Sequence, residues 1–183
     1  MDYKKKELKI APPAEAQKIK ILLMGDCCVG KTQLAKRFCE SGYDKKYSAT
    51  IGVEYFSKTI EISGTATLVT FWDLGGHPEF FEVRNEFYKD CGAILLMFDI
   101  TAKKTFTSLD MWLREANKFG AKEVPLCVCG GKADLQAQRA VPKIEAEEWA
   151  RQRNFMYAEA SGNTNAGVSE IVESLAKKVL FYK

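Results

Sequence analysis

The sequence lacks any run of about 18 consecutive apolar residues, which excludes a predicted membrane-spanning helix. It also lacks a strong excess of charge, because 27 basic residues face 24 acidic ones and leave a formal net charge of +3. That balance is too mild for the basic footprint of a nucleic-acid-binding protein, so no nucleic acid is expected as a partner. The first 20 residues hold no apolar segment of the kind found in secretory signals. We therefore expect an intracellular protein, cytoplasmic or nuclear, that is not secreted.

The six cysteines show none of the spacings that hold zinc, and without an export signal they are expected in a reducing compartment. Most are therefore expected to be small, buried apolar side chains. Cys27 and Cys28 stand apart, since they are adjacent and fall within a motif described below. The segment Leu180–Lys183 has no cysteine, so no prenyl anchor is expected in this chain, and with Asp2 after Met1 no N-myristoylation is expected either.

With 183 residues, 46% of them hydrophobic, the chain has the size and composition of one folded domain. Residues 1–17 are polar and contain Pro12-Pro13, so we expect a flexible arm ahead of a single domain over residues 18–183. In that domain, apolar runs of strand length alternate with segments of helical periodicity. The predicted strands are 18–24, 53–62, 68–72, 93–98, 125–129 and 155–158, and the predicted helices are 31–41, 106–116, 142–153 and 168–180.

Strands that are apolar throughout, such as Ala93–Phe98, are typical of a parallel sheet covered on both faces. Ser63-Gly64 lies between two β-rich runs and predicts a hairpin. We therefore predict an α/β fold, with a mostly parallel six-stranded sheet, one antiparallel hairpin edge and helices on both faces. Ligands of such sheets bind beyond the carboxyl ends of the strands, here the loops after Met24, Trp72, Cys129 and Ala158.

The first of these loops has the pattern G-x-x-x-x-G-K-[ST], in the form Gly25-Asp26-Cys27-Cys28-Val29-Gly30-Lys31-Thr32. It lies between a predicted strand and a predicted helix, which is the context that a phosphate-binding loop needs. Its glycines let successive backbone N–H groups face a phosphate chain, and the following helix directs its positive dipole end there. We expect the segment from Asp26 to Gln33 around the phosphates, Lys31 on the β- and γ-phosphates and the Thr32 hydroxyl on Mg²⁺.

Two further loops are candidates for the metal and the γ-phosphate. Asp73 follows a predicted strand, where a carboxylate can hold Mg²⁺ through water. Gly76 can offer its backbone N–H to a γ-phosphate, with no side chain in the way. Thr50 lies between the first helix and the second strand, and its hydroxyl is a candidate to close on Mg²⁺.

The order of these motifs, with Lys132-Ala133-Asp134 and Glu159-Ala160-Ser161-Gly162 after them, resembles the Ras superfamily of small GTPases over residues 18–182. Tyr47–Val53 and Trp72-Asp73 most resemble the Rab branch, and residues 77–90 are similar to the Rab-like proteins that carry a C-terminal J domain, the RJL or RBJ family. The resemblance implies a magnesium-dependent GTP/GDP switch. Exchange factors, activating proteins and effectors would recognise its loops near Thr50 and Gly76. An aromatic trio, Phe56, Trp72 and Tyr88, is expected near these loops, and two interpretations stay open for it, as part of the recognised surface or as ordinary core aromatics. It implies Hsp70 as a partner only if a J domain follows Lys183.

The guanine site departs from the family pattern, which expects Asn-Lys-x-Asp where this chain has Gly131-Lys132-Ala133-Asp134. Asp134 keeps the carboxylate that accepts from the guanine N1–H and amino group, so guanine preference is expected to survive. The missing Asn amide weakens binding by about 1 kcal/mol for each lost neutral hydrogen bond. The other candidate contacts are Ser161, the Gly162 N–H to guanine O6, Asn163 in place of the usual lysine, and Tyr43 edge-on against the base.

The position after Gly76 normally carries the glutamine that orients the attacking water, and here it is His77, the only histidine. Two interpretations stay open: the imidazole positions water or acts as a base, or it points away and hydrolysis is slow. Cys27 and Cys28 can crowd the transition state, and we also consider their reaction with oxidants. We predict a GTP hydrolase of low turnover, with candidate catalytic residues His77, Lys31 and Gly76. The alternative is a constitutively GTP-bound, non-hydrolysing scaffold, while Asp134 disfavours an ATP-using kinase or ATPase.

Overall fold

The computed structural model describes residues 16–40 and 48–181. Six strands form one sheet in the order β2-β3-β1-β4-β5-β6. Of the strand pairs in the described part, β2 with β3 is antiparallel and the other four are parallel. The predicted sheet with one hairpin edge is therefore confirmed. The strands are β1 (Gln17–Met24), β2 (Val53–Ile62), β3 (Thr65–Leu74), β4 (Ala93–Asp99), β5 (Leu126–Gly131) and β6 (Met156–Glu159).

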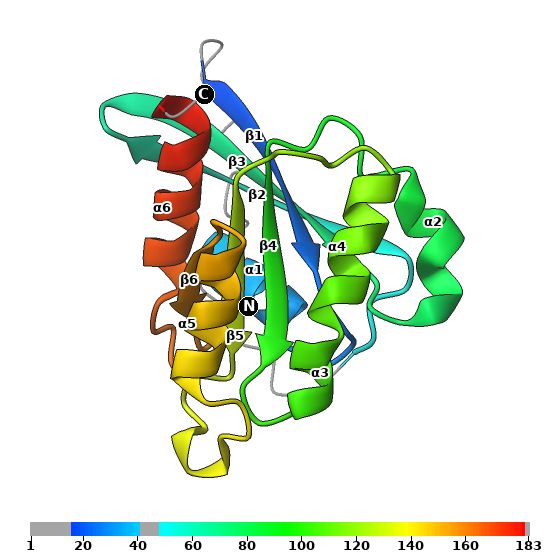
Figure 1. Cartoon of the computed structure of the whole chain (residues 1–183). Coiled ribbons are helices and arrows are strands. Elements are labelled where there is room, and N and C mark those ends of the chain that lie inside the picture. The colour runs from blue at the N-terminus through cyan, green and yellow to red at the C-terminus, as the bar shows by residue number, and fades with distance from the viewer. Residues whose placement is uncertain (1–15, 41–47, 182–183) are drawn as a thin grey trace, which may run out of the picture.

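Helices lie on both faces of the sheet (Figure 1). Alternate residues of each strand point to opposite faces, so Ile21 and Leu23 join the core under α1 and α6, while Leu22 and Met24 join the core under α3, α4 and α5. The helices are α1 (Lys31–Glu40), α2 (Phe81–Asn85), α3 (Lys103–Thr107), α4 (Leu109–Lys118), α5 (Lys143–Gln152) and α6 (Val168–Phe181), with 3₁₀ turns at Pro78–Phe80 and Gln136–Gln138.

Three local features differ from the sequence prediction. The helix expected over 106–116 is two helices, α3 and α4, that meet at Ser108. The turn Pro78–Phe80 and α2 were not predicted, because elements of three and five residues are too short to show a helical period. Strand β3 is longer than expected because it pairs with β2 along its whole length.

Some predictions fall outside the described residues. Most of the expected N-terminal arm, residues 1–15, lies there, as does Tyr43, the expected aromatic neighbour of the base. Gln17, the last residue of the expected arm, belongs to β1 instead. None of the helices in the described segments is long and apolar enough to cross a membrane.

The topology brings the chemically interesting loops to one edge of the sheet. β1 lies between β3 and β4, and the parallel register pairs Leu23 with Asp73. The loop that follows Met24 therefore begins beside the end of β3. Because β4, β5 and β6 run in the same direction, their loops open at the same edge, where ligands of such sheets bind.

Candidate nucleotide-binding site

A cavity of about 730 Å³ opens at this edge, within the range of about 300–1,000 Å³ that is usual for small-molecule sites. The structure brings most of the predicted site residues to its wall. These are Cys27, Cys28, Val29, Gly30, Lys31, Thr32, Gln33, Thr50, Gly76, His77, Lys132, Asp134, Gly162 and Asn163. Three others, Asp26, Asp73 and Ser161, lie just behind the wall and bond to residues that form it.

Lys31 lies beneath the loop that joins β1 to α1, and its side chain is buried. Its Nζ donates to the carbonyl oxygens of Gly25 and Asp26, both at 2.8 Å. Burial lowers the pKa of the ammonium, and the negative charges of Asp73 and Asp26 act against that shift. The result is a cation held by main-chain oxygens at the floor of a loop of backbone amides, which is an arrangement suited to an anion.

Three oxygen-bearing side chains meet on the neighbouring wall. The hydroxyl of Thr32 donates to Asp73 Oδ2 at 2.5 Å and lies 3.0 Å from the hydroxyl of Thr50, which in turn donates to the same Oδ2 at 3.3 Å. Burial raises the pKa of Asp73 from 3.8 to about 6, against the opposing pull of Lys31 and Thr32. Asp73 Oδ1 is buried and has no hydrogen-bond partner within 16–40 and 48–181.

These oxygens fit the magnesium ion that the sequence implies. Mg²⁺ prefers hard oxygen donors and retains several waters, so it is held by few protein groups. Two hydroxyls and one carboxylate supply such donors, and the unpartnered Oδ1 is a free acceptor for a metal-bound water. A buried carboxylate oxygen without a partner is costly in free energy, and a metal-bound water at Oδ1 would remove that cost.

The loop after β3 closes over the phosphate loop through its glycines. A Cβ added at Gly76 would lie 2.4 Å from Cys27 N and 2.5 Å from the Asp26 carbonyl carbon, so only glycine allows this approach. The neighbouring Gly75 N–H donates to the Gly52 carbonyl at 2.7 Å. The segments that carry Thr50 and Gly76 are thus joined to each other across the mouth of the cavity.

At the other end of the cavity, two side chains hold the Asp134 carboxylate. Ser161 Oγ donates to Oδ1 at 2.6 Å, and Asn163 Nδ2 donates to Oδ2 at 3.0 Å. Partial burial acts to raise the pKa of Asp134, but these hydrogen bonds outweigh it and the pKa is lowered. The carboxylate is therefore ionised, fixed in orientation and exposed to a ligand.

Two contacts that the sequence did not reveal brace this end. Arg37, on α1, donates through Nε to the Gly162 carbonyl and through Nη2 to the Asn163 carbonyl, both at 2.9 Å.

On the other side of the base end, a Cβ added at Gly131 would lie 2.4 Å from the Val29 carbonyl oxygen. Where the family has an Asn side chain, this chain therefore packs its own backbone directly on the phosphate loop. Lys132 is ion-paired with Asp99 at 2.6 Å.

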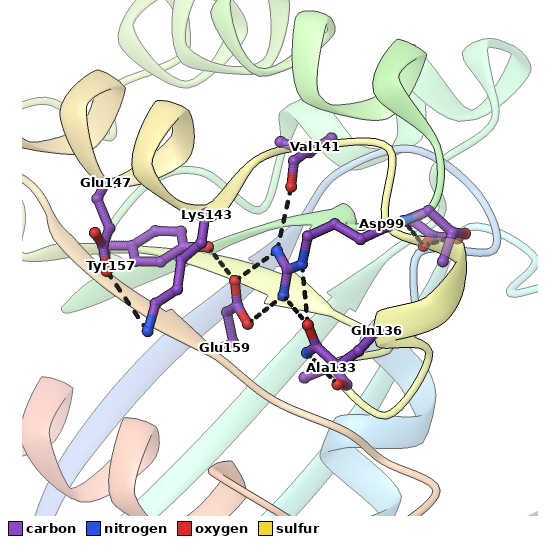
Figure 2. Close-up of polar contacts among 10 residues, drawn as sticks. Asp99, Ala133, Gln136, Val141, Lys143, Glu147, Tyr157 and Glu159 are labelled. Carbon is purple, nitrogen blue, oxygen red and sulfur yellow. Dashed lines mark hydrogen bonds and ion pairs between the residues drawn. The ribbon is translucent and has the colours of Figure 1, made fainter.

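A second layer of polar contacts supports the loop that carries Asp134, and Figure 2 shows these contacts. Arg139 makes a two-pronged ion pair with Glu159, at 2.9 and 2.7 Å, and also donates to Gln136. Gln136 donates in turn to the Ala133 carbonyl at 2.6 Å, and Tyr157 donates to Glu159. The loop that carries Asp134 is thus tied to the end of β6.

His77 lies at the cavity but is engaged in a local turn. Its Nδ1 accepts from the Glu79 N–H at 3.5 Å and caps the 3₁₀ turn, and its side chain is 57% exposed. Its carbonyl accepts from Arg84 Nη1 at 3.0 Å, and so does that of Gly75 at 3.2 Å. Of the two interpretations of Tyr88, the structure supports the core aromatic, because Tyr88 is fully buried and its hydroxyl donates to Glu115, out of reach of a partner protein. Phe56 and Trp72 are partly buried.

Comparison with known families decides the identity of this arrangement. The model of the Ras family matches residues 20–181 of this chain. The chain belongs to the Ras family. Members of this family of small GTPases bind guanine nucleotide and Mg²⁺, which agrees with the amide loop and the oxygen cluster of this Ras-family domain.

The similar curated proteins extend this result. DnaJ homolog subfamily C member 27 of Rattus norvegicus is 35% identical over 173 residues, which cover 92% of this chain and 63% of the relative. The proteins of the same name from Mus musculus and Homo sapiens are 36% and 35% identical over 167 residues, 88% of this chain and 61% of each relative. The resemblance to Rab-like proteins with a J domain is thereby confirmed. This Ras-family chain spans about three fifths of the length of these relatives.

Proposed function

We propose that this chain is a guanine-nucleotide switch with slow intrinsic GTP hydrolysis. The main support for this proposal is Asp134, an exposed and ionised carboxylate whose two oxygens are aligned by Ser161 and Asn163. A carboxylate in this position accepts from the N1–H and the amino group of guanine, whereas adenine offers no donor at N1. The proposal therefore predicts preference for GTP and GDP over ATP.

The triphosphate is assigned to the opposite end of the cavity. The backbone amides from Asp26 to Gln33 would surround the phosphates, and Lys31 would neutralise the β- and γ-phosphates. Thr32 and Thr50 would bind Mg²⁺ directly and Asp73 through water, and the ion would supply positive charge to the phosphate oxygens. Support comes from the shared contacts of these three side chains and from the unpartnered Asp73 Oδ1.

The switch itself is assigned to the segments around Thr50 and Gly76. They meet through the Gly75–Gly52 hydrogen bond, and Gly76 approaches the phosphate loop closely. A γ-phosphate that accepts from the Gly76 N–H would stabilise this closed arrangement, and its loss would release it. Effectors, exchange factors and activating proteins would recognise the adjoining exposed apolar side chains, which are Ile51, Tyr55, Phe81 and Val83.

The proposal of slow hydrolysis is supported by the local contacts of His77. Its Nδ1 is occupied by the Glu79 N–H and its backbone by Arg84, which favours a ring that does not orient the attacking water. Loss of water positioning or proton transfer typically costs about 10²–10⁴-fold in rate. Lys31 and Gly76 would still stabilise the developing charge, so hydrolysis is expected to be slow and measurable.

Single-turnover hydrolysis of GTP with variants at His77 tests this. We expect His77→Gln to raise the rate by about tenfold or more, and His77→Ala to change it by less than about threefold. A collapse of the rate in His77→Ala would assign the imidazole to the chemistry instead. If no variant hydrolyses GTP even with excess activating protein, the chain is a constitutively GTP-bound scaffold.

Three wider features are also proposals. Residues 18–183 are taken as one G domain, preceded by an arm. An intracellular site of action is supported by the six cysteines, all free thiols, two of them exposed. Hsp70 is proposed as a partner only in a protein where a J domain follows this chain, as the name of the DnaJ homologs suggests for those relatives.

A further inference from the structure

Two adjacent thiols line the phosphate end of the cavity, and the proposed function assigns them no chemistry of their own. Cys27 and Cys28 are both exposed and both belong to the cavity wall. They lie on the loop just before Lys31, the first residue of α1, whose ammonium and the neighbouring backbone amides form a site for anions. A reagent small enough to enter the cavity therefore meets two sulfur nucleophiles.

The other four cysteines are protected from such reagents. Cys39 is half-buried, and Cys91, Cys127 and Cys129 are buried. Burial raises the pKa of Cys39 and Cys127 to about 12 and that of Cys91 to about 11, and it raises the pKa of Cys129 well above its ordinary value. Since the thiolate is the reactive form, reaction at these four is slow at neutral pH. Selectivity for the cavity pair therefore follows from the burial of the other thiols, which both blocks access to them and raises their pKa.

We propose that Cys27 and Cys28 form a modification site for low-molecular-weight disulfides, and that the adduct closes the phosphate cavity to GTP. This rests on the proposed function. The thiolate of one cysteine attacks a sulfur of the disulfide, a bond forms between the two sulfurs, and the original S–S bond breaks. The departing half leaves as a thiolate and is protonated, while the proton of the protein thiol goes to solvent. The protein sulfur is oxidised and the leaving sulfur is reduced, so no further oxidant is needed.

The expected product is the mixed disulfide rather than a Cys27–Cys28 bond. Neighbouring Cα atoms are about 3.8 Å apart across a trans peptide. Unstrained disulfides join Cα atoms about 4.4–6.8 Å apart, so ring closure between adjacent residues is disfavoured. The small-molecule half consequently remains attached inside the cavity.

The position of the adduct predicts which nucleotide is affected more. Gly76 packs directly on the Cys27 N–H, and the segment that carries it is bonded to the Thr50 segment. A bulky group on either sulfur would prevent this closure, on which the proposed γ-phosphate contacts depend. We therefore expect GTP affinity to fall by about tenfold or more, and GDP affinity to fall less.

The test uses the full chain and glutathione disulfide as the probe. The protein is treated at neutral pH, adducts are located by mass spectrometry of peptides, and GTP and GDP are titrated with Mg²⁺ before and after treatment and again after a dithiol reductant. We expect one adduct at Cys27 or Cys28, weaker GTP binding, and full recovery on reduction. Cys39→Ser is the matched control and should behave as the parent chain, whereas treatment should no longer alter nucleotide affinity in Cys27→Ser/Cys28→Ser.

The outcomes separate the two proposals. If the untreated chain binds neither GTP nor GDP, the proposed function fails. The inference is overturned and the proposed function stands if the untreated chain binds both nucleotides and the adduct binds each of them as tightly as the untreated chain does. The same conclusion follows if the adduct lowers the affinity for GDP more than the affinity for GTP. Adducts that appear first at Cys39 or at a buried cysteine, or no adduct at all, also overturn it.

Discussion

Arg84 of α2 and Glu115 of α4 form a two-pronged ion pair that is almost completely buried, with Nε to Oε1 at 2.5 Å and Nη2 to Oε2 at 2.7 Å. The two helices lie side by side (Figure 1). The same guanidinium holds the carbonyls of Gly75 and His77 and lies 4.4 Å from the Trp112 ring centroid, and Trp112 Nε1 donates to Asp26. The ion pair thus joins the Gly76 segment, α4 and the phosphate loop.

This buried pair predicts a large effect of single substitutions. Arg84→Met leaves the Glu115 carboxylate buried without its partner, and we expect the free energy of unfolding to fall by about 3–5 kcal/mol. Urea denaturation of the nucleotide-free protein measures this. The double variant Arg84→Met/Glu115→Leu removes both charges and should recover a large part of the loss. If Arg84→Met alone costs less than about 1 kcal/mol, the pair is a minor contributor.

Asp73 predicts a pH dependence of stability in the nucleotide-free protein. Burial raises its folded-state pKa from 3.8 to about 6, so the folded protein binds this proton more tightly than the unfolded chain. The resulting stabilisation is fully present below pH 3.8 and is lost as the pH rises through 6, by about 3 kcal/mol in total. Comparison of denaturation curves for the parent chain and Asp73→Asn from pH 4 to pH 7 isolates the Asp73 contribution.

In that comparison, Asp73→Asn should lose less stability than the parent chain as the pH rises, and it should be the more stable of the two at pH 7. Its affinity for GTP should depend less on Mg²⁺, because the amide lacks the charge that orders metal-bound water. Equal pH slopes for the two proteins, or an unchanged magnesium requirement, would show that Asp73 does not act as described.

The packing of Gly131 predicts that restoring the asparagine usual in this family weakens nucleotide binding in this chain. Restoring asparagine at this position supplies the missing amide, but its Cβ would lie 2.4 Å from the Val29 carbonyl oxygen and 3.2 Å from that of Phe98. The phosphate loop would have to shift, so Gly131→Asn should weaken GDP binding by about tenfold. Gly131→Ala is the matched control and should show most of the same loss. Tighter GDP binding by Gly131→Asn would mean that the loop has room for the amide.

The parts of the site that could be predicted from the sequence are those whose residues are contiguous. Gly25–Thr32 matches a motif of fixed spacing that lies between a strand and a helix. The loops at Asp73 and Asp134 follow apolar strands at one sheet edge. Each such segment can be recognised from a few neighbouring residues in the sequence. The parallel register that pairs Leu23 with Asp73 then brings these segments together.

The bracing contacts could not be predicted, because they join residues far apart in the chain whose types are ordinary on a helix surface. Arg37 reaches Gly162 across 125 positions, and Arg84 reaches Glu115 across 31. The sequence left Tyr88 undecided between surface and core for the same reason. Its hydroxyl found a buried partner in Glu115, which lets an aromatic ring with a polar end pack inside the protein.

Calorimetric titration of the full chain with GTP, GDP and ATP in the presence of Mg²⁺ tests the central claim, that a loop of amides with Lys31 binds phosphate while Asp134 selects guanine. The account predicts heat on addition of GTP and GDP, much weaker binding of ATP, and loss of the preference for GTP over ATP in Asp134→Ala. No heat with either guanine nucleotide, or binding of ATP as tight as that of GTP, would contradict it.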